Sequence, residues 1–120
     1  FMFMSGYEDE AAFDAFAQRI DLRPVAPNIE CPYMVVAGEA DQLSPIEHTE
    51  HLFTLINAPK KLVIFEGANH GVGDAPSVAN GEEKVTMIAD WLLDRINGKP
   101  FASERIWVDS AGRMQHNPYT

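Results

Sequence analysis

An aspartate and a histidine each stand shortly after an apolar run of the sequence. The run Pro32–Ala37 leads into a Gly-x-x-Asp sequence that ends at Asp41, and the run Lys61–Phe65 leads into a Gly-x-x-His sequence that ends at His70. A carboxylate placed against one imidazole nitrogen fixes the tautomer of the ring and stabilises its protonated form. The histidine can then take a proton as general base and return it as general acid. This chemistry is that of the last two members of a nucleophile–histidine–acid triad.

The segments that carry these two residues indicate strands of a parallel sheet. Tyr33–Ala37 and Lys61–Phe65 are apolar without clean alternation, which is typical of strands that are buried on both faces. A helix is expected between them, from Pro45 to about Asn57, and such a short crossover implies parallel, right-handed pairing. Because reactive groups gather outside the carboxyl ends of parallel strands, we expect Asp41 and His70 to meet at one rim.

The remaining elements complete an α/β pattern. Two parallel strands alone would leave apolar edges unpaired, so we expect the end of a larger doubly wound sheet, or a sheet completed by a partner. The further expected elements are a helix over Ser5–Ile20 capped by Ser5 or Gly6, a connector over Asp21–Glu30, a long loop over Gly67–Asn80, a helix over Glu82–Ile96, and a small hairpin over Arg105–Met114 with its turn at Asp109–Gly112.

The composition excludes several classes of function. A chain of 120 residues with 46% hydrophobic content is at most one ordinary domain. Its net charge of −9 argues against a nucleic-acid partner and against an anionic membrane surface. The single cysteine, Cys31, excludes an internal disulfide, and we expect it to be a buried small hydrophobe. No apolar run reaches the length of a membrane helix and no secretory leader opens the chain, so a cytoplasmic location is expected.

Other residues offer weaker chemistry. Glu39, two positions before Asp41, is an alternative acid, and the glycines at 38, 67, 71 and 73 would let backbone approach a ligand closely. His48 and His51 lie three apart on one helix face, which metal sites can use with a carboxylate as a third ligand, although a solvated helix face is the better interpretation. Ser44 is expected to cap the helix that follows it.

Residues 31–95 resemble the C-terminal portion of an α/β-hydrolase. The segment CPYMVVAGEADQLSP resembles the strand and loop that bring the triad acid, KKLVIFEGANHG the last core strand with its histidine loop, and IADWLLDRI the final helix. The flanks FMFMSGYEDEAAFDAF and SERIWVDSAGR are similar to a branch of that superfamily. This branch contains dihydroxypseudooxynicotine hydrolase and fungal polyketide-shortening hydrolases, which cleave carbon–carbon bonds beside ketones, or esters.

The resemblance implies a division of the chain and a set of roles. Residues 1–30 would be a cap or lid helix with its connector, residues 31–98 the C-terminal part of the hydrolase core, and residues 99–120 a tail with a β-hairpin. Asp41 would be the triad acid and His70 the proton shuttle on a small-molecule carbonyl or ester substrate. Activated serine chemistry requires neither metal nor cofactor, so none is expected.

This chain differs from the family in its nucleophile. The nucleophile of the family sits in a Gly-x-Ser-x-Gly sequence, which this chain lacks, and none of its serines suits that role; they are Ser5, Ser44, Ser77, Ser103 and Ser110. We therefore expect a C-terminal fragment that is inactive alone and that works with the missing N-terminal portion of the hydrolase or with a second copy. The alternative is a non-catalytic α/β binding or assembly module that dimerises through its open sheet edge, with Asp41 and His70 far apart.

Overall fold

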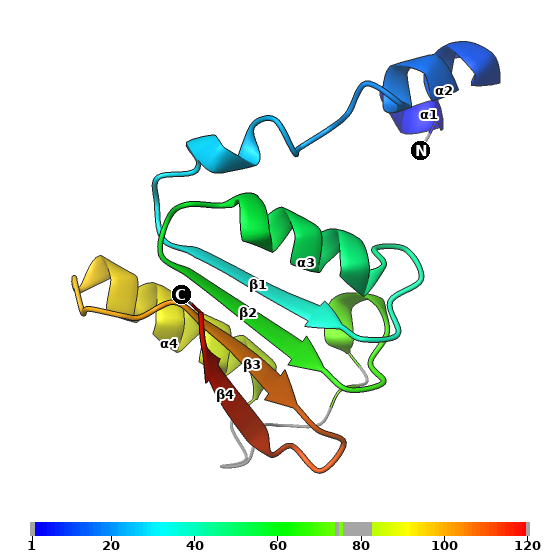
Figure 1. Cartoon of the computed structure of the whole chain (residues 1–120). Helices are drawn as coiled ribbons and strands as arrows, with labels where there is room; N and C mark the ends of the chain where they lie inside the picture. The colour runs from blue at the N-terminus through cyan, green and yellow to red at the C-terminus, as the bar shows by residue number, and fades with distance from the viewer. Residues whose placement is uncertain (1, 74, 76–82, 120) are drawn as a thin grey trace.

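The computed structural model describes residues 2–73, 75 and 83–119. Two layers of helices enclose one sheet, and a third helical segment stands apart at the N-terminal end (Figure 1). In chain order the elements are α1 (Met2–Ser5), α2 (Glu10–Ala17), η1 (Ala26–Asn28), β1 (Tyr33–Gly38), α3 (Ile46–Leu55), β2 (Lys60–Phe65), η2 (His70–Val72), α4 (Lys84–Ile96), β3 (Glu104–Val108) and β4 (Met114–Pro118).

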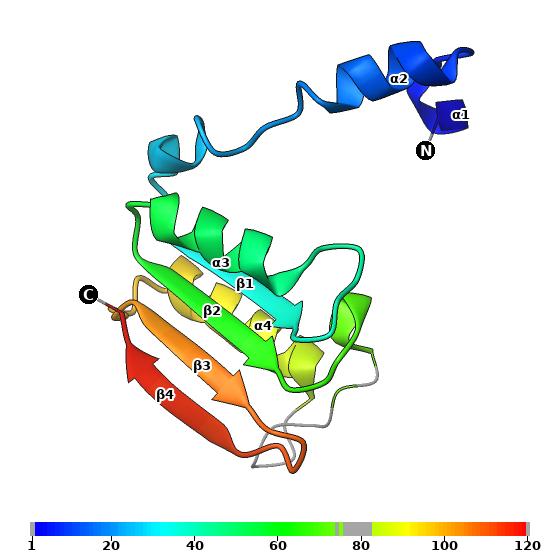
Figure 2. The same ribbon diagram turned by 45° about the vertical axis from the view of Figure 1, so that its right-hand side comes forward.

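The sheet has the order β1-β2-β3-β4, with β1, β2 and β3 parallel and β4 antiparallel to β3 (Figure 2). The register pairs Gly38 with Phe65 and Phe65 with Val108, so the carboxyl ends of the three parallel strands reach the same rim. The α/β class and the parallel pairing of the first two strands are thereby confirmed.

The expected C-terminal hairpin is confirmed, and it is longer than expected. Its strands run over Glu104–Val108 and Met114–Pro118, and the turn closes through hydrogen bonds between Asp109 and Arg113 and from Gly112 to Asp109. Strand β3 pairs with β2, so the hairpin extends the sheet instead of forming a separate tail structure. One edge of the expected strand pair is therefore completed by the hairpin of the same chain, and β1 is the outer strand of the described sheet on the other side.

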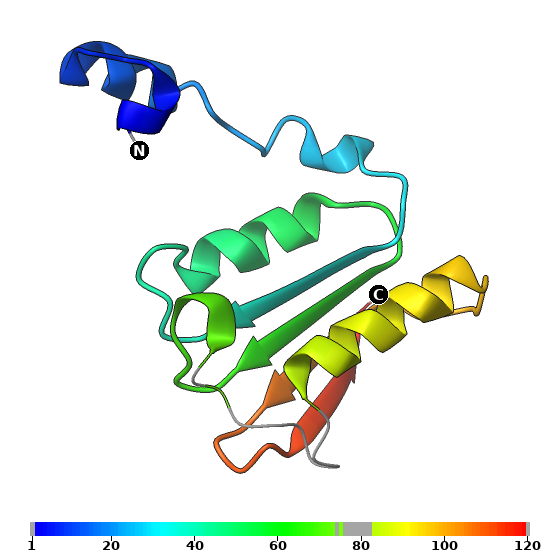
Figure 3. The ribbon, with the colours of Figure 1, turned by 180° about the vertical axis from the view of Figure 1, so that it is seen from behind.

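The helices α3 and α4 cover opposite faces of the sheet (Figure 3). Each face has its own apolar cluster, because alternate side chains of β2 point to opposite faces and its last four residues, Leu62–Phe65, are apolar. On the α3 face Phe53 packs with Leu62 and Ile64, and on the α4 face Val63 and Phe65 pack with Met87 among others. Burial on both faces explains why the sequence of β2 lacks alternation.

The N-terminal helix is divided. Instead of one helix over Ser5–Ile20, two short helices flank Gly6, which adopts a left-handed backbone (φ 75°) and ends α1. Neither Ser5 nor Gly6 caps α2; the cap is Asp9, whose Oδ2 accepts a hydrogen bond from Ala12 N at 2.8 Å.

Two further expectations need comment. Cys31 is exposed, so its expected burial is wrong: it precedes the first residue of β1 and is not part of the core. The second half of the expected loop Gly67–Asn80, with Ser77, and the first residue of the expected helix Glu82–Ile96 lie outside the described residues. Within the part of the chain that the structure describes, no helix has the length and apolarity needed to span a bilayer.

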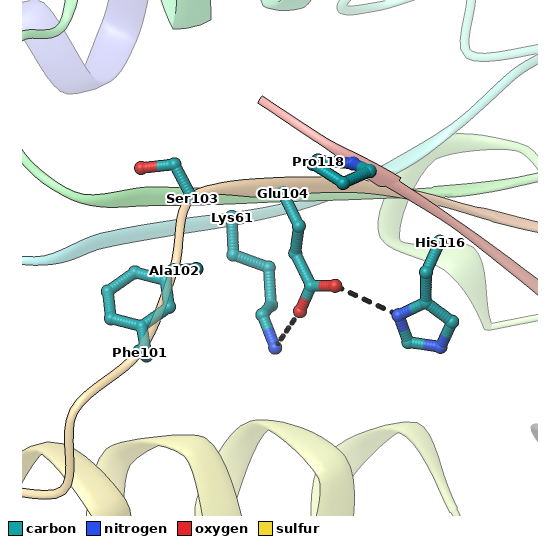
Figure 4. Close-up of a pocket in the computed structure, with 7 residues that line it drawn as sticks. All are labelled: Lys61, Phe101, Ala102, Ser103, Glu104, His116 and Pro118. Atoms are coloured by element: carbon teal, nitrogen blue, oxygen red, sulfur yellow. Dashed lines mark hydrogen bonds and ion pairs between the residues drawn. The ribbon is translucent and has the colours of Figure 1, made fainter. Parts of the chain in front are cut away.

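A charged cluster joins three strands on the face that α4 covers (Figure 4). Glu104 of β3 accepts from Lys61 Nζ of β2 at 2.6 Å and from His116 Nδ1 of β4 at 2.8 Å. Partial burial raises the pKa of the Glu104 carboxyl, but the hydrogen bonds from His116 and Lys61 outweigh it and hold that pKa below its ordinary value of 4.5. The ionised carboxylate thus stabilises the fold.

The contribution of Glu104 to stability should depend on pH. Because its pKa is lower in the folded than in the unfolded state, its stabilisation is present above pH 4.5 and is lost as the pH falls through the folded value. We expect Glu104→Gln to reduce the free energy of unfolding by about 1–2 kcal/mol at pH 6 and by much less at pH 3. Urea denaturation at both pH values measures this, with Glu47→Gln on the exposed face of α3 as control. An equal loss at both pH values would contradict the assignment.

Candidate active site

Asp41 lies in the loop after β1 and its carboxylate is held by backbone donors. Oδ1 accepts hydrogen bonds from the N–H groups of Leu43 at 2.8 Å and Ser44 at 2.9 Å, and the side chain is 7% exposed. The Ser44 N–H lowers the pKa of Asp41 most; desolvation opposes it, and the bonds from His70 and Leu43 add to the lowering. The carboxylate is therefore ionised at neutral pH and fixed in orientation.

His70 begins η2 and faces Asp41. Its Nδ1 lies 2.8 Å from Asp41 Oδ2, and because an ionised carboxylate only accepts hydrogen bonds, Nδ1 is the donor. The ring is 59% exposed, so the opposite nitrogen, Nε2, is open to exchange a proton with a bound group. The expected meeting of the two side chains at the rim is thereby confirmed, whereas their catalytic role stays a prediction.

A small hollow of about 250 Å³ lies against this pair. Its floor is the end of β1, and Thr49 of α3, a residue that the sequence analysis missed, contributes to its wall. A polar residue in the first turns of the helix after the Gly-x-x-Asp loop is the sequence signal that could have identified Thr49. The signal is weak, because polar residues occur on every exposed helix face. The lining residues are Val35, Val36, Ala37, Gly38, Asp41, Ser44, Thr49, His70 and Gly71.

Gly38 brings the two loops together. A Cβ atom at this position would lie 2.2 Å from the carbonyl oxygen of Ala68 and 2.5 Å from that of Asn69, closer than any side chain permits. The backbone of the histidine loop therefore rests directly on the last residue of β1. Gly38 also lines the hollow, so the expected close approach of its backbone to a ligand stays a prediction.

The backbone beyond His70 is strained. Gly71 has φ 79° and Val72 has φ 50°, a left-handed conformation that β-branched residues rarely adopt. The side chain of Val72 is buried in the cluster on the α4 face, which holds the residue in this conformation. This local geometry turns the chain sharply just after the histidine.

The other candidate residues do not join the pair. Glu39 points to the turn between β2 and η2, where its Oε2 accepts from Gly67 N at 2.9 Å, so it is not the partner of the imidazole. Ser44 does not cap α3, because Pro45 is the cap residue and the Ser44 N–H is directed to Asp41. His48 and His51 line a separate hollow between α3 and the connector. Among the described residues no group of three His, Cys, Asp or Glu is placed to hold a metal ion.

Comparison with known proteins adds little to this geometry. No family model matches the chain, and no solved structure matches it. The chain is 30% identical over 66 residues to the uncharacterized protein YfhR of Escherichia coli strain K12, and 29% identical over the same length to YfhR of Escherichia coli O157:H7. Each match covers 55% of this chain and 22% of the relative, so the chain spans about a fifth of the length of these proteins.

The contact at Gly38 predicts that alanine is more destabilising at this position than at Gly73. Gly38→Ala should lower the free energy of unfolding by about 1–3 kcal/mol or more, because the methyl group meets main-chain carbonyls that cannot rotate away. Gly73→Ala is the matched control, since a Cβ there meets no atom within 4 Å and the backbone has φ −63°. Chemical denaturation of both variants tests this. Equal stabilities would show that the loops do not touch as described.

Proposed function

We propose that this chain is the acid–base portion of a serine α/β-hydrolase that cleaves an ester, or a carbon–carbon bond next to a carbonyl, in a small molecule. The observation that carries the proposal is the 2.8 Å hydrogen bond between Asp41 and His70 at the carboxyl ends of adjacent parallel strands. This arrangement supports the resemblance of residues 31–95 to the C-terminal portion of that superfamily, where the same two segments bring the acid and the histidine.

In this proposal each proton transfer passes through His70. Nε2 accepts the proton of a serine hydroxyl as the serine oxygen attacks the substrate carbonyl, and then delivers the proton to the leaving group. The same nitrogen next takes a proton from the water that attacks the acyl-enzyme and returns it to the serine oxygen as the bond between serine and acyl group breaks, which frees the acid product. Asp41 stays ionised throughout, because its hydrogen bonds hold its pKa low, and it stabilises the imidazolium.

The nucleophile and the oxyanion hole are assigned to a part of the hydrolase outside these 120 residues. The chain has no Gly-x-Ser-x-Gly sequence, and its relatives are several times longer than the segment it matches. Of the described serines, Ser44 lines the hollow, but its place in the chain is not that of a strand-to-helix elbow. The proposed setting is the cytoplasm, and the chemistry requires neither a metal nor a cofactor.

A dimerising, non-catalytic module is the second candidate. It is favoured by one observation: β1 is the outer strand of the described sheet, and its free edge could pair with another copy. Such a module has no need of a buried carboxylate fixed against an exposed imidazole, and this pair favours the hydrolase. Two results together would favour the module. The first is a stable dimer in size-exclusion chromatography, and the second is ester turnover that is either unchanged in a His70 variant or absent from the unmutated protein.

Removing either member of the pair should abolish turnover. In the protein that carries this chain together with its nucleophile segment, we expect His70→Ala and Asp41→Asn each to reduce kcat for a short aryl ester by about 10⁴-fold. His51→Ala, an exposed histidine of α3, is the control and should leave kcat unchanged. Release of the phenol, followed by absorbance, is the measurement. Ordinary turnover by His70→Ala would overturn the proposed function.

A further inference from the structure

The turn that leads to His70 is fastened on both sides by glutamates. On one side Glu39, from the loop after β1, accepts a hydrogen bond from Gly67 N at 2.9 Å through Oε2. On the other side Glu66 accepts from Ser110 N, in the turn between β3 and β4, at 2.7 Å. The two residues of the turn, Glu66 and Gly67, are thus tied to separate parts of the rim.

Main-chain hydrogen bonds run beside the Glu39 contact. Glu39 N donates to Phe65 O at 3.0 Å, and Ala40 N donates to Ala68 O at 2.9 Å. Together with the side-chain bond to Gly67, they join the loop that carries Asp41 to residues 65, 67 and 68, just before His70. These bonds, with the backbone contact at Gly38, hold the two loops that carry Asp41 and His70 in place.

The bond from Gly67 N to Glu39 acts on a turn that has left the strand ladder. Gly67 has a left-handed backbone (φ 65°) at the point where β2 has ended, and its N–H donates to the Glu39 carboxylate, which ties this exposed turn to the loop after β1. Gly67 precedes His70 by three residues, so a shift of the turn is transmitted to the imidazole. Misplacement of a catalytic group by about 1 Å is enough to cost a large factor in rate.

We propose that Glu39 is a positioning residue for His70, which deepens and rests on the proposed function. Its task is to accept one hydrogen bond from the histidine turn and so hold the imidazole against Asp41. It is not the triad acid, since its carboxylate is bonded to Gly67 N and Asp41 holds the ring. An amide oxygen can accept the same bond, so the charge of Glu39 is not required.

The kinetic test compares two variants in the full protein. Glu39→Ala should lower kcat about 3- to 10-fold with KM unchanged, because it removes one exposed, charge-assisted hydrogen bond. Glu39→Gln should restore kcat to within a factor of about two, since the acceptor remains. Glu47→Ala, also an exposed glutamate, controls for the loss of a surface charge. A Gln variant as impaired as Asp41→Asn would show that Glu39 acts as the acid, and an unimpaired Ala variant would show that it does not position His70.

A second measurement does not depend on turnover. In the protein with ¹⁵N-labelled histidine, NMR reports which ring nitrogen of His70 carries the proton, and the bond to Asp41 keeps it on Nδ1. We expect one tautomer in the parent and in Glu39→Gln, and a mixture in Glu39→Ala. A single Nδ1-protonated tautomer in Glu39→Ala would overturn the positioning role even if the protein is a hydrolase. The expected mixture would uphold it even if His70→Ala shows that the proposed activity is wrong.

Discussion

The rim of this sheet is organised around a contact between two stretches of main chain. At Gly38 the end of β1 lies so close to the carbonyl groups of Ala68 and Asn69 that no side chain fits between them. A contact between backbones transmits position without the freedom of rotamers. It limits the spacing of the two loop backbones, and the hydrogen bonds of Glu39 and the 2.8 Å bond between Asp41 and His70 are made within that spacing.

Asp41, Glu39 and Glu66, three acidic side chains at this rim, have separate electrostatic tasks. Asp41 is nearly buried, accepts two backbone N–H groups and faces the imidazole, so its charge is both stabilised and directed. Glu39 and Glu66 are exposed, and each accepts one backbone N–H from a neighbouring turn. Asp41 is thus suited to act on the imidazole, whereas Glu39 and Glu66 hold turns of the main chain in place. The residue types alone do not distinguish these tasks, but burial and hydrogen bonding do.

Much of the fold and the central pair could be predicted from local sequence patterns. The strands β1 and β2, the helix between them and the meeting of Asp41 with His70 follow from apolar runs, turn residues and the handedness of short crossovers. The pairing of β3 with β2 could not be predicted, because it joins segments far apart in the chain and β3 carries charged residues among apolar ones. The break at Gly6, the cap at Asp9 and the bond from Gly67 N to Glu39 depend on backbone angles that several polar residues in each loop would satisfy equally well.

The pair and the strands that hold it come from one continuous stretch of chain. The segment from Tyr33 to His70 forms β1, α3 and β2 in succession, and 29 positions separate Asp41 from His70. Closing short loops costs less chain entropy than closing long ones, and proteins rich in local contacts fold faster. Strand β3 must instead return across the whole of α4 before it reaches β2. The chain-entropy cost of bringing Asp41 and His70 together is therefore smaller than that of docking the C-terminal hairpin onto β2.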